Sequence, residues 1–219
     1  MFKIDKIVDL SWTIDNNSPV YPGDPIPNIQ PFCTINDIGY NLFSIHLGTQ
    51  SGTHVDAPFH LRYGAKTIDQ MPLKQFIGEA FIIDVSDKNE LEEITIAELA
   101  PFEEDLKSVN IVMIKTNWYK YVRTDKYLKH PYLNIDACKY LITLGINFIC
   151  IDTLNLDKTF EAKKFPVHEY CADNNVMVCE NMANFDKIDF LKPVLVAIPM
   201  NIVGGDGSPV RAFVMRVNN

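Results

Sequence analysis

The chain has few cysteines, no long apolar run and no excess of positive charge, and each shortage excludes a class of protein. Its five cysteines are odd in number and show no CxxC spacing, which argues against a disulfide framework and a thiolate zinc site. No segment approaches the roughly 18 apolar residues of a membrane-spanning helix, and the first residues lack a signal peptide's apolar run. A net charge of −8 leaves no basic stripe for a nucleic-acid backbone. We therefore expect a cytoplasmic protein that binds neither nucleic acid nor membrane.

What the chain does have is the composition of an ordinary globular protein. Its 219 residues are 47% apolar and 22% charged, which predicts a single domain over residues 1–219. Apolar runs at residues 80–85, 110–116, 146–152, 176–181 and 193–202 predict strands, the last of them a long one. Helical segments between them begin at Thr95 with Glu98, at Asn134 and at Pro166. This alternation predicts an α/β fold with a sheet covered on both faces.

The N-terminal part differs from the rest. Residues 18–32 contain five prolines, which fix the backbone and remove amide donors. We expect an extended, looping segment without a helix there.

The segment GTQSGTHVDAPFH, residues 48–60, carries the chemistry. His54 and Asp56 are two residues apart, so in an extended chain they project to the same side, about 6–7 Å apart. Imidazole with carboxylate suits Zn²⁺, Mn²⁺ or Fe²⁺ better than Ca²⁺ or Mg²⁺. Pro58 turns the chain before His60. The alternative is a pair of surface histidines beside a turn aspartate.

Further segments extend this pattern along nearly the whole chain. They are SPVYPGD (18–24), SGTHVDAPFH (51–60), IDTLNLD (151–157), the pair His168 and Glu180, and GGDGSPVRA (204–212). In this order they resemble the metal-dependent cyclase family, which includes bacterial kynurenine formamidases and isatin hydrolases. The resemblance implies a swivelling β/α/β-type core with a mixed sheet and flanking helices, assembled as a homodimer or homotetramer.

The resemblance also implies a metal centre and an activity. His54, Asp56, His168 and Glu180 would hold one or two divalent ions per subunit, Zn²⁺ or Mn²⁺. The substrate would be a small amide or cyclic amide such as N-formylkynurenine, whose carbon–nitrogen bond is hydrolysed by metal-activated water. Two alternatives stay open: a lactone or cyclic-imide hydrolase, and a catalytically silent metal- or ligand-binding relative.

Gln50 departs from the family pattern, in which histidine is common. Extended chain would separate residues 50 and 54 by about 13 Å, so the segment must bend, as Ser51 and Gly52 permit. Either Gln50 ligates through its carbonyl oxygen and the site favours a harder ion such as Mn²⁺, or that metal position is weak or empty. His46 lies about 13 Å farther upstream and is interpreted as structural.

Two residues and one loop receive roles other than coordination. The resemblance leaves His60 outside the ligand set, and an imidazole pKa near 6.5 suits a general acid and base. The alternative for His60 is an orienting or simply packed histidine. Tyr21 stands where kynurenine formamidases carry tryptophan, and it either stacks on a flat substrate or packs within its loop. The 204–212 loop shapes the pocket through Asp206 or backbone amides, or is only a glycine turn.

Overall fold

A computed structural model of the chain describes residues 3–159 and 164–218. The strands are β1 (Lys3–Asp9), β2 (Asn28–Cys33), β3 (Leu42–His46), β4 (His54–Asp56), β5 (Ile77–Asp84), β6 (Glu93–Ile94), β7 (Ile111–Lys115), β8 (Tyr132–Leu133), β9 (Phe148–Ile151), β10 (Met177–Glu180), β11 (Val194–Val196), β12 (Gly207–Pro209) and β13 (Phe213–Asn218). The α-helices are α1 (Ile35–Ile38), α2 (Ile96–Leu99), α3 (Glu103–Lys107), α4 (Ile135–Thr143) and α5 (Pro166–Asp173).

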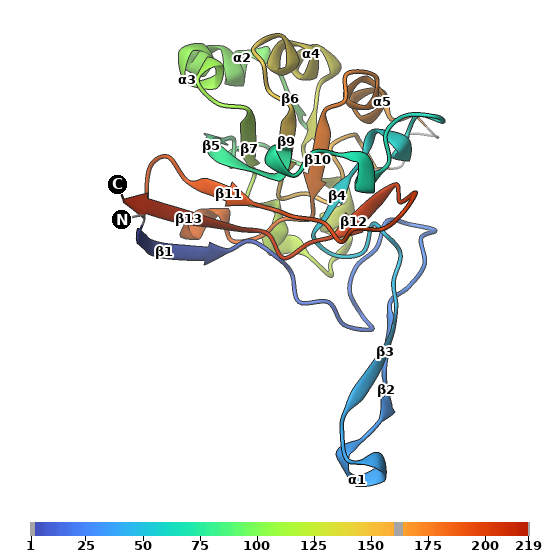
Figure 1. The fold of residues 1–219 in the computed structure, drawn as a ribbon. Helices are drawn as coiled ribbons and strands as arrows, with labels where there is room; N and C mark the ends of the chain where they lie inside the picture. Colours follow the sequence, from blue (N-terminus) through green and yellow to red (C-terminus); the bar gives the residue numbers. More distant parts are fainter. Residues whose placement is uncertain (1–2, 160–163, 219) are drawn as a thin grey trace.

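Nine strands form one mixed sheet in the order β1-β13-β11-β5-β7-β9-β10-β4-β12. The central strands β5, β7, β9 and β10 run parallel, whereas the pairs on either side of them are antiparallel. Helices α2 to α5 cover one face of the parallel strands, and β1, β11 and β13 lie on the opposite side (Figure 1). The expected α/β fold with a mixed sheet and flanking helices is confirmed.

The parallel strands are buried on both faces, as their continuous apolar runs predict. In β9, Phe148 and Cys150 join an apolar cluster with Leu195 and Val214 of the antiparallel strands. The alternate residues Ile149 and Ile151 join a second cluster under the helices. The sheet therefore separates two apolar cores, and the site lies at the neighbouring strands β10 and β4, next to the edge strand β12.

Local signals located most element ends correctly. Thr95 and Glu98 form the expected capping box before α2, and the Asn134 side chain accepts a hydrogen bond from the amide of Asp136 at the start of α4. Gly145, which follows α4, has a φ of 98°, a conformation that favours glycine.

Two sequence predictions about the elements are wrong. The strand expected over 193–202 is only Val194–Val196 long, because the chain leaves the sheet before Pro199, which has no amide to donate. The helix expected after Thr95 is broken into α2, a 3₁₀ turn with Pro101, and α3.

One segment of the chain projects away from the domain that contains the main sheet (Figure 1). Strands β2 and β3 pair with each other alone, with α1 at their tip, and project away from the sheet (Figure 1). Within residues 3–159 and 164–218, no helix has both the length and the apolar character needed to cross a bilayer.

Candidate metal centre and active site

Strand β4 carries two of the expected metal ligands, His54 and Asp56. It lies between β10 and β12, with Glu180 of β10 directly opposite His54 and Gly207 of β12 directly opposite Asp56. The chain bends before β4 at Gly52, whose φ of 65° favours glycine. The extended geometry of β4 then directs His54 and Asp56 to the same side, as predicted.

His168 reaches the same place from α5. The Asp157 carboxylate accepts hydrogen bonds from the amides of Val167 and His168, both at 3.0 Å, which are the first free amides of a helix that begins with Pro166. The same carboxylate accepts a 2.7 Å hydrogen bond from His168 Nδ1. One residue of the 151–157 segment therefore caps the helix and orients the imidazole that the helix carries.

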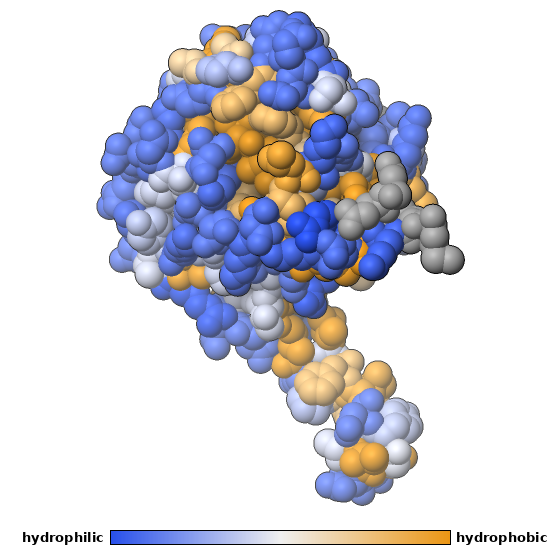
Figure 2. Space-filling model, turned by 90° about the vertical axis from the view of Figure 1, so that its left-hand side faces the viewer, coloured by the Kyte–Doolittle hydropathy of each residue, from blue (hydrophilic) through white to orange (hydrophobic). Residues whose placement is uncertain are grey.

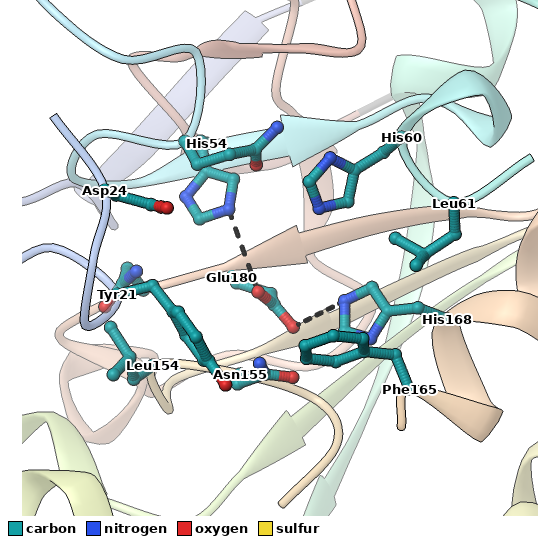
Figure 3. Close-up of a pocket in the computed structure, with 12 residues that line it drawn as sticks. Tyr21, Asp24, His54, His60, Leu61, Leu154, Asn155, Phe165, His168 and Glu180 are labelled. Atoms are coloured by element: carbon teal, nitrogen blue, oxygen red, sulfur yellow. Dashed lines mark ion pairs between the residues drawn. The ribbon is translucent and has the colours of Figure 1, made fainter. Parts of the chain in front are cut away.

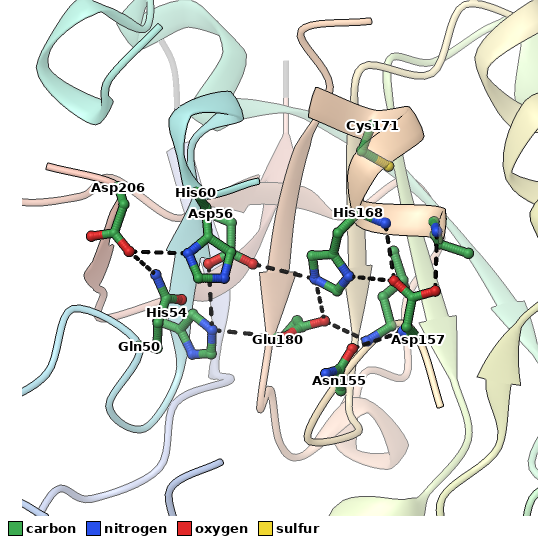
Figure 4. A network of polar contacts seen from close by, with 12 residues as sticks. Gln50, His54, Asp56, His60, Asn155, Asp157, His168, Cys171, Glu180 and Asp206 are labelled. Carbon is green, nitrogen blue, oxygen red and sulfur yellow. Dashed lines mark hydrogen bonds and ion pairs between the residues drawn. The ribbon is translucent and has the colours of Figure 1, made fainter. Parts of the chain in front are cut away.

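The four expected ligands converge in one buried cluster (Figure 4). His54 Nε2 lies 3.6 Å from Asp56 Oδ1 and 3.7 Å from Glu180 Oε2. His168 Nε2 lies 3.5 Å from Asp56 Oδ2 and 3.0 Å from Glu180 Oε1. Ligand atoms of His54, Asp56 and Glu180 all lie within 4.8 Å of one another. The structure therefore brings together residues that lie up to 126 positions apart (180 − 54).

The donor set fits a divalent metal ion. His54 Nδ1 donates to the Gly52 carbonyl oxygen at 2.8 Å, and His168 Nδ1 is bonded to Asp157, so both Nε2 atoms face the carboxylates. Asp56 Oδ1 is buried and has no hydrogen-bond partner among the described residues. Buried carboxylate oxygens are costly without a partner, and a cation between the two Nε2 atoms and the two carboxylates supplies one.

The ionisation of the cluster agrees with this fit. Burial acts to lower the pKa of His168, but the Glu180 charge and the hydrogen bonds to Asp157, Asp56 and Glu180 outweigh it and hold that pKa well above its usual value. Burial acts to raise the pKa of Asp56, yet the neighbouring histidines hold it below its usual value. The buried carboxylates are thus held ionised by positive charge beside them, which a bound divalent cation would supply in place of the imidazolium proton.

Gln50 lies at the edge of this cluster. Its Nε2 donates to Asp206 Oδ2 at 3.2 Å, while its Oε1 is buried and has no hydrogen-bond partner among the described residues. Gly207 leaves room for it, since a Cβ there would lie 2.5 Å from Gln50 Nε2 and 2.6 Å from the Val55 carbonyl oxygen. The amide nitrogen of Gln50 is therefore engaged in a hydrogen bond, whereas its carbonyl oxygen makes none with the described residues.

His60 lies beside the cluster, on a 3₁₀ turn over Pro58–His60 that follows β4. Its Nδ1 is 3.0 Å from Asp206 Oδ2, and its side chain is 32% exposed, far more than the four expected ligands. Asp206 also accepts a 2.8 Å hydrogen bond from Thr49 Oγ1. Among the described residues, no hydrogen bond engages His60 Nε2, so this nitrogen is available next to the cluster.

A cavity of about 320 Å³ opens over the cluster (Figure 3). Its polar floor includes His54, His168 and Glu180. Its walls are Tyr21, Asp24, Gln50, His60, Leu61, Leu154, Asn155, Phe165 and Asn181. The Tyr21 and Phe165 rings meet edge to face with centroids 6.2 Å apart. The cavity therefore combines an aromatic wall with a polar, metal-fitting floor.

Comparison with known proteins agrees with this arrangement. The family model "Cyclase" matches residues 8–158. A kynurenine formamidase of Geobacillus thermodenitrificans is 30% identical over 96% of this chain and 97% of its own length. The chain belongs to the cyclase family.

Solved structures of the cyclase family share the fold. Isatin hydrolase A from Labrenzia aggregata, bound to benzyl benzoate, is 26% identical, with a TM-score of 0.87 over 96% of this chain and 93% of that one. A Bacillus stearothermophilus protein described as a "predicted metal-dependent hydrolase" is 24% identical, with a TM-score of 0.78 over 96% of this chain and 98% of that one. At this identity the second likeness concerns the fold alone.

Sequence reasoning about this cyclase-family site missed three residues that the structure places in or beside it: Asp24, Asp157 and Phe165. Asp206, which it named only as one way in which the 204–212 loop shapes the pocket, contacts His60 and Gln50. Asp24 and Asp157 end two of the segments that carry the resemblance, so their positions were available as signals. Phe165 carried no signal, because only the path of the chain into α5 directs it to the cavity.

Proposed function

We propose that the protein is a metal-dependent hydrolase of a carbon–nitrogen bond in a small amide or cyclic amide, and that N-formylkynurenine is the first substrate to test. The observation that carries this proposal is the convergence of two imidazole Nε2 atoms and two carboxylates on the floor of an aromatic-walled cavity. The kynurenine formamidase and isatin hydrolase relatives support the choice of substrate class.

His54, Asp56, His168 and Glu180 are the proposed ligands of the ion. A bound divalent ion supplies Lewis-acid chemistry, polarising a carbonyl group and lowering the pKa of water. Zn²⁺ and Mn²⁺ suit the mixture of imidazole and carboxylate. Gln50 Oε1 is buried without a hydrogen-bond partner in the part of the chain that the structure describes, which favours Gln50 as a further donor, and a neutral oxygen favours the harder Mn²⁺.

The other residues have distinct proposed tasks. His60 moves a proton between Nε2 and the reacting groups, since its Nδ1 is engaged by Asp206. Asp206 is a positioning residue that selects the tautomer and angle of the ring. Tyr21 and Phe165 hold a flat substrate against the cavity wall and exclude water from it.

A lactone or cyclic-imide hydrolase is the second candidate, since the likeness to isatin hydrolase A supports a ring-opening reaction, which these substrates would share with a cyclic amide. We further propose that the enzyme acts in the cytoplasm, where its five unpaired cysteines stay reduced.

A substrate panel with Mn²⁺ or Zn²⁺ tests the proposal and separates the candidates. We expect turnover of N-formylkynurenine or a cyclic amide above the rate in buffer, and faster turnover of a lactone would favour the second candidate. His60→Ala should lower kcat by about 10²–10⁴-fold without loss of bound metal. The matched control is His46→Ala, which removes an exposed imidazole on β3 and should leave kcat unchanged.

Metal analysis decides whether the protein is an enzyme at all. Protein purified without chelator should contain close to one or two ions per chain. Negligible metal together with no activity after reconstitution would instead support a silent relative of the family.

A further inference from the structure

The cavity above the proposed metal centre has one carboxylate that none of the roles described so far uses. Asp24 lines the cavity, and Figure 3 shows its carboxylate directed toward the interior from the side on which Tyr21 lies. No hydrogen bond or ion pair with another described residue engages that carboxylate. Because it is partly removed from water and has no such partner, a ligand that supplies a donor gains affinity there.

A tight turn fixes the position of Asp24. Its amide donates to the Tyr21 carbonyl oxygen at 3.0 Å, which closes a four-residue turn with Pro22 and Gly23 at its centre. Gly23 has a φ of 104°, a conformation that favours glycine at the third position of a type II turn. The first and last residues of such a turn lie close together, and both of them line the cavity. The sequence YPGD therefore presents an aromatic ring and a carboxylate to the cavity as one unit.

The rest of the cavity wall carries little positive charge. No lysine or arginine among the described residues lines it. Outside the four expected ligands, the one wall residue that can become cationic is His60, whose Nδ1 is already bonded to Asp206. The exposed apolar side chains of β2 and β3, which Figure 2 shows on the projecting segment, do not line the cavity. The other wall residues are aromatic, aliphatic or neutral amides: Tyr21, Gln50, Leu61, Leu154, Asn155, Phe165 and Asn181.

The electrostatic surroundings of Asp24 favour a cation as its partner. Burial raises the pKa of Asp24, and the His60 and His54 charges, which act to lower it, do not outweigh burial. A cation beside Asp24 would reverse this shift, because positive charge stabilises the ionised carboxylate. The rings of Tyr21 and Phe165 act in the same direction, since the face of an aromatic ring attracts a cation. A substrate carboxylate in the same space would instead be repelled by Asp24.

We propose that Asp24 is a specificity-determining residue that binds an ammonium group of the substrate, so that the enzyme prefers amides with a cationic amine and no free carboxylate. The inference rests on the hydrolase function proposed above, because it assumes that the reacting carbonyl group lies over the metal-fitting floor. A substrate whose amide lies on that floor can place a side chain beside Tyr21 and Asp24 on the wall. N-formylkynurenine, which carries an ammonium and a carboxylate group, meets this preference only in part.

Three aryl formamides that share the reacting group and differ in side-chain charge test the proposal on the metal-loaded enzyme. They are N-formylkynurenine, the same compound with hydrogen in place of its carboxyl group, and the uncharged 2-formamidoacetophenone. The decarboxylated compound should have a kcat/KM at least about tenfold higher than either of the others, because hydrogen bonds between charged groups are the stronger ones. The difference should lie mainly in KM, since all three present the same formamide to the metal centre.

Asp24→Asn keeps the shape of the side chain but removes its charge. The ratio of kcat/KM for the cationic formamide to that for the uncharged one should fall about 10–100-fold. The matched control is Asp87→Asn, which removes the same charge from an exposed residue that does not line the cavity and should leave the ratio unchanged. An unchanged ratio in Asp24→Asn, an equal fall in the control, or a wild-type kcat/KM for N-formylkynurenine that equals or exceeds that for the decarboxylated compound would each overturn the proposal.

A binding measurement separates this inference from the proposed function. The three aryl amines that remain after removal of the formyl group cannot be hydrolysed in this way, so their binding requires no activity. Ligand-observed NMR on the full-length protein with Mn²⁺ or Zn²⁺ added should give the lowest dissociation constant for the cationic compound, and Asp24→Asn should abolish that preference. If the preference holds while no formamide is hydrolysed, the hydrolase function is wrong but Asp24 still binds the ammonium group. Hydrolysis of all three formamides without a charge preference would support the hydrolase function and overturn the role of Asp24.

Discussion

Asp206 Oδ2 lies 3.0 Å from His60 Nδ1 and 3.2 Å from Gln50 Nε2, so one carboxylate holds two site residues that flank β4. The loop that carries Asp206 lies more than 140 residues farther along the chain. Proton transfer by His60 and the placement of the Gln50 carbonyl oxygen thus depend on the same group. Substitutions at Asp206 and Gln50 separate these two dependencies.

Asp206→Asn should lower kcat by about 10–100-fold, less than the loss of His60 itself, because the imidazole remains but is no longer oriented by a carboxylate. Burial acts to lower the pKa of His60, and the Asp56 charge and the Asp206 hydrogen bond outweigh it and raise that pKa. Removing the Asp206 charge should therefore lower the pKa of His60 and move the acidic limb of the kcat profile to lower pH.

The pH dependence of kcat in both proteins measures this shift. Asp69→Asn is the control, since Asp69 accepts a hydrogen bond from Gly204 in the same loop but does not contact His60. An unchanged acidic limb in Asp206→Asn would show that His60 is not the group whose ionisation limits the rate.

Gln50→Leu approximately keeps the side-chain volume but removes Oε1, the buried oxygen for which the described residues offer no hydrogen-bond partner. If that oxygen is a donor, Mn²⁺ should bind at least about tenfold more weakly, a change of about 1.4 kcal/mol. Gln50→His should change the affinity in the opposite direction and favour Zn²⁺, because imidazole is the softer and stronger donor. Chelator competition measures both constants. Equal affinities in Gln50→Leu and wild type would remove Gln50 from the ligand set.

Asp157→Asn should weaken metal binding by about 10–100-fold, because the amide no longer fixes the tautomer and orientation of His168. It should also destabilise the fold by about 1 kcal/mol, since the carboxylate caps the first amides of α5. Metal titration and denaturant unfolding report the two effects separately. Asp173→Asn, at the other end of α5 and paired with Arg62 at the surface, should leave metal affinity unchanged.

Removing the metal should lower the melting temperature. Free metal at 1,000 times its dissociation constant stabilises the folded state by about 4 kcal/mol, which corresponds to about 10 °C for a chain of this length. Affinity should weaken as the pH falls, because the raised pKa of His168 means that a proton competes with the ion for Nε2. Calorimetry in buffers of different ionisation enthalpy should detect proton release on binding, and no release would contradict the assignment of His168 as a ligand.

Several elements could be predicted because their causes are local. The Thr95–Glu98 capping box, the Asn134 cap and the turn at Gly145 each depend on residues within a few positions. The long strand expected after Pro193 could not be predicted correctly, because apolar character extends beyond the residues that find a hydrogen-bonding neighbour.

The sequence by itself determined the α/β class, the pairing of His54 with Asp56 on one side of a strand, and the family, because alternation, spacing and motif order are properties of the chain alone. Only the tertiary structure decided that Asp157 orients His168, that Asp206 holds both His60 and Gln50, and that β2 and β3 project away from the main sheet (Figure 1). These relationships join residues distant in sequence, and their geometry follows from sheet register and packing, which no local pattern encodes.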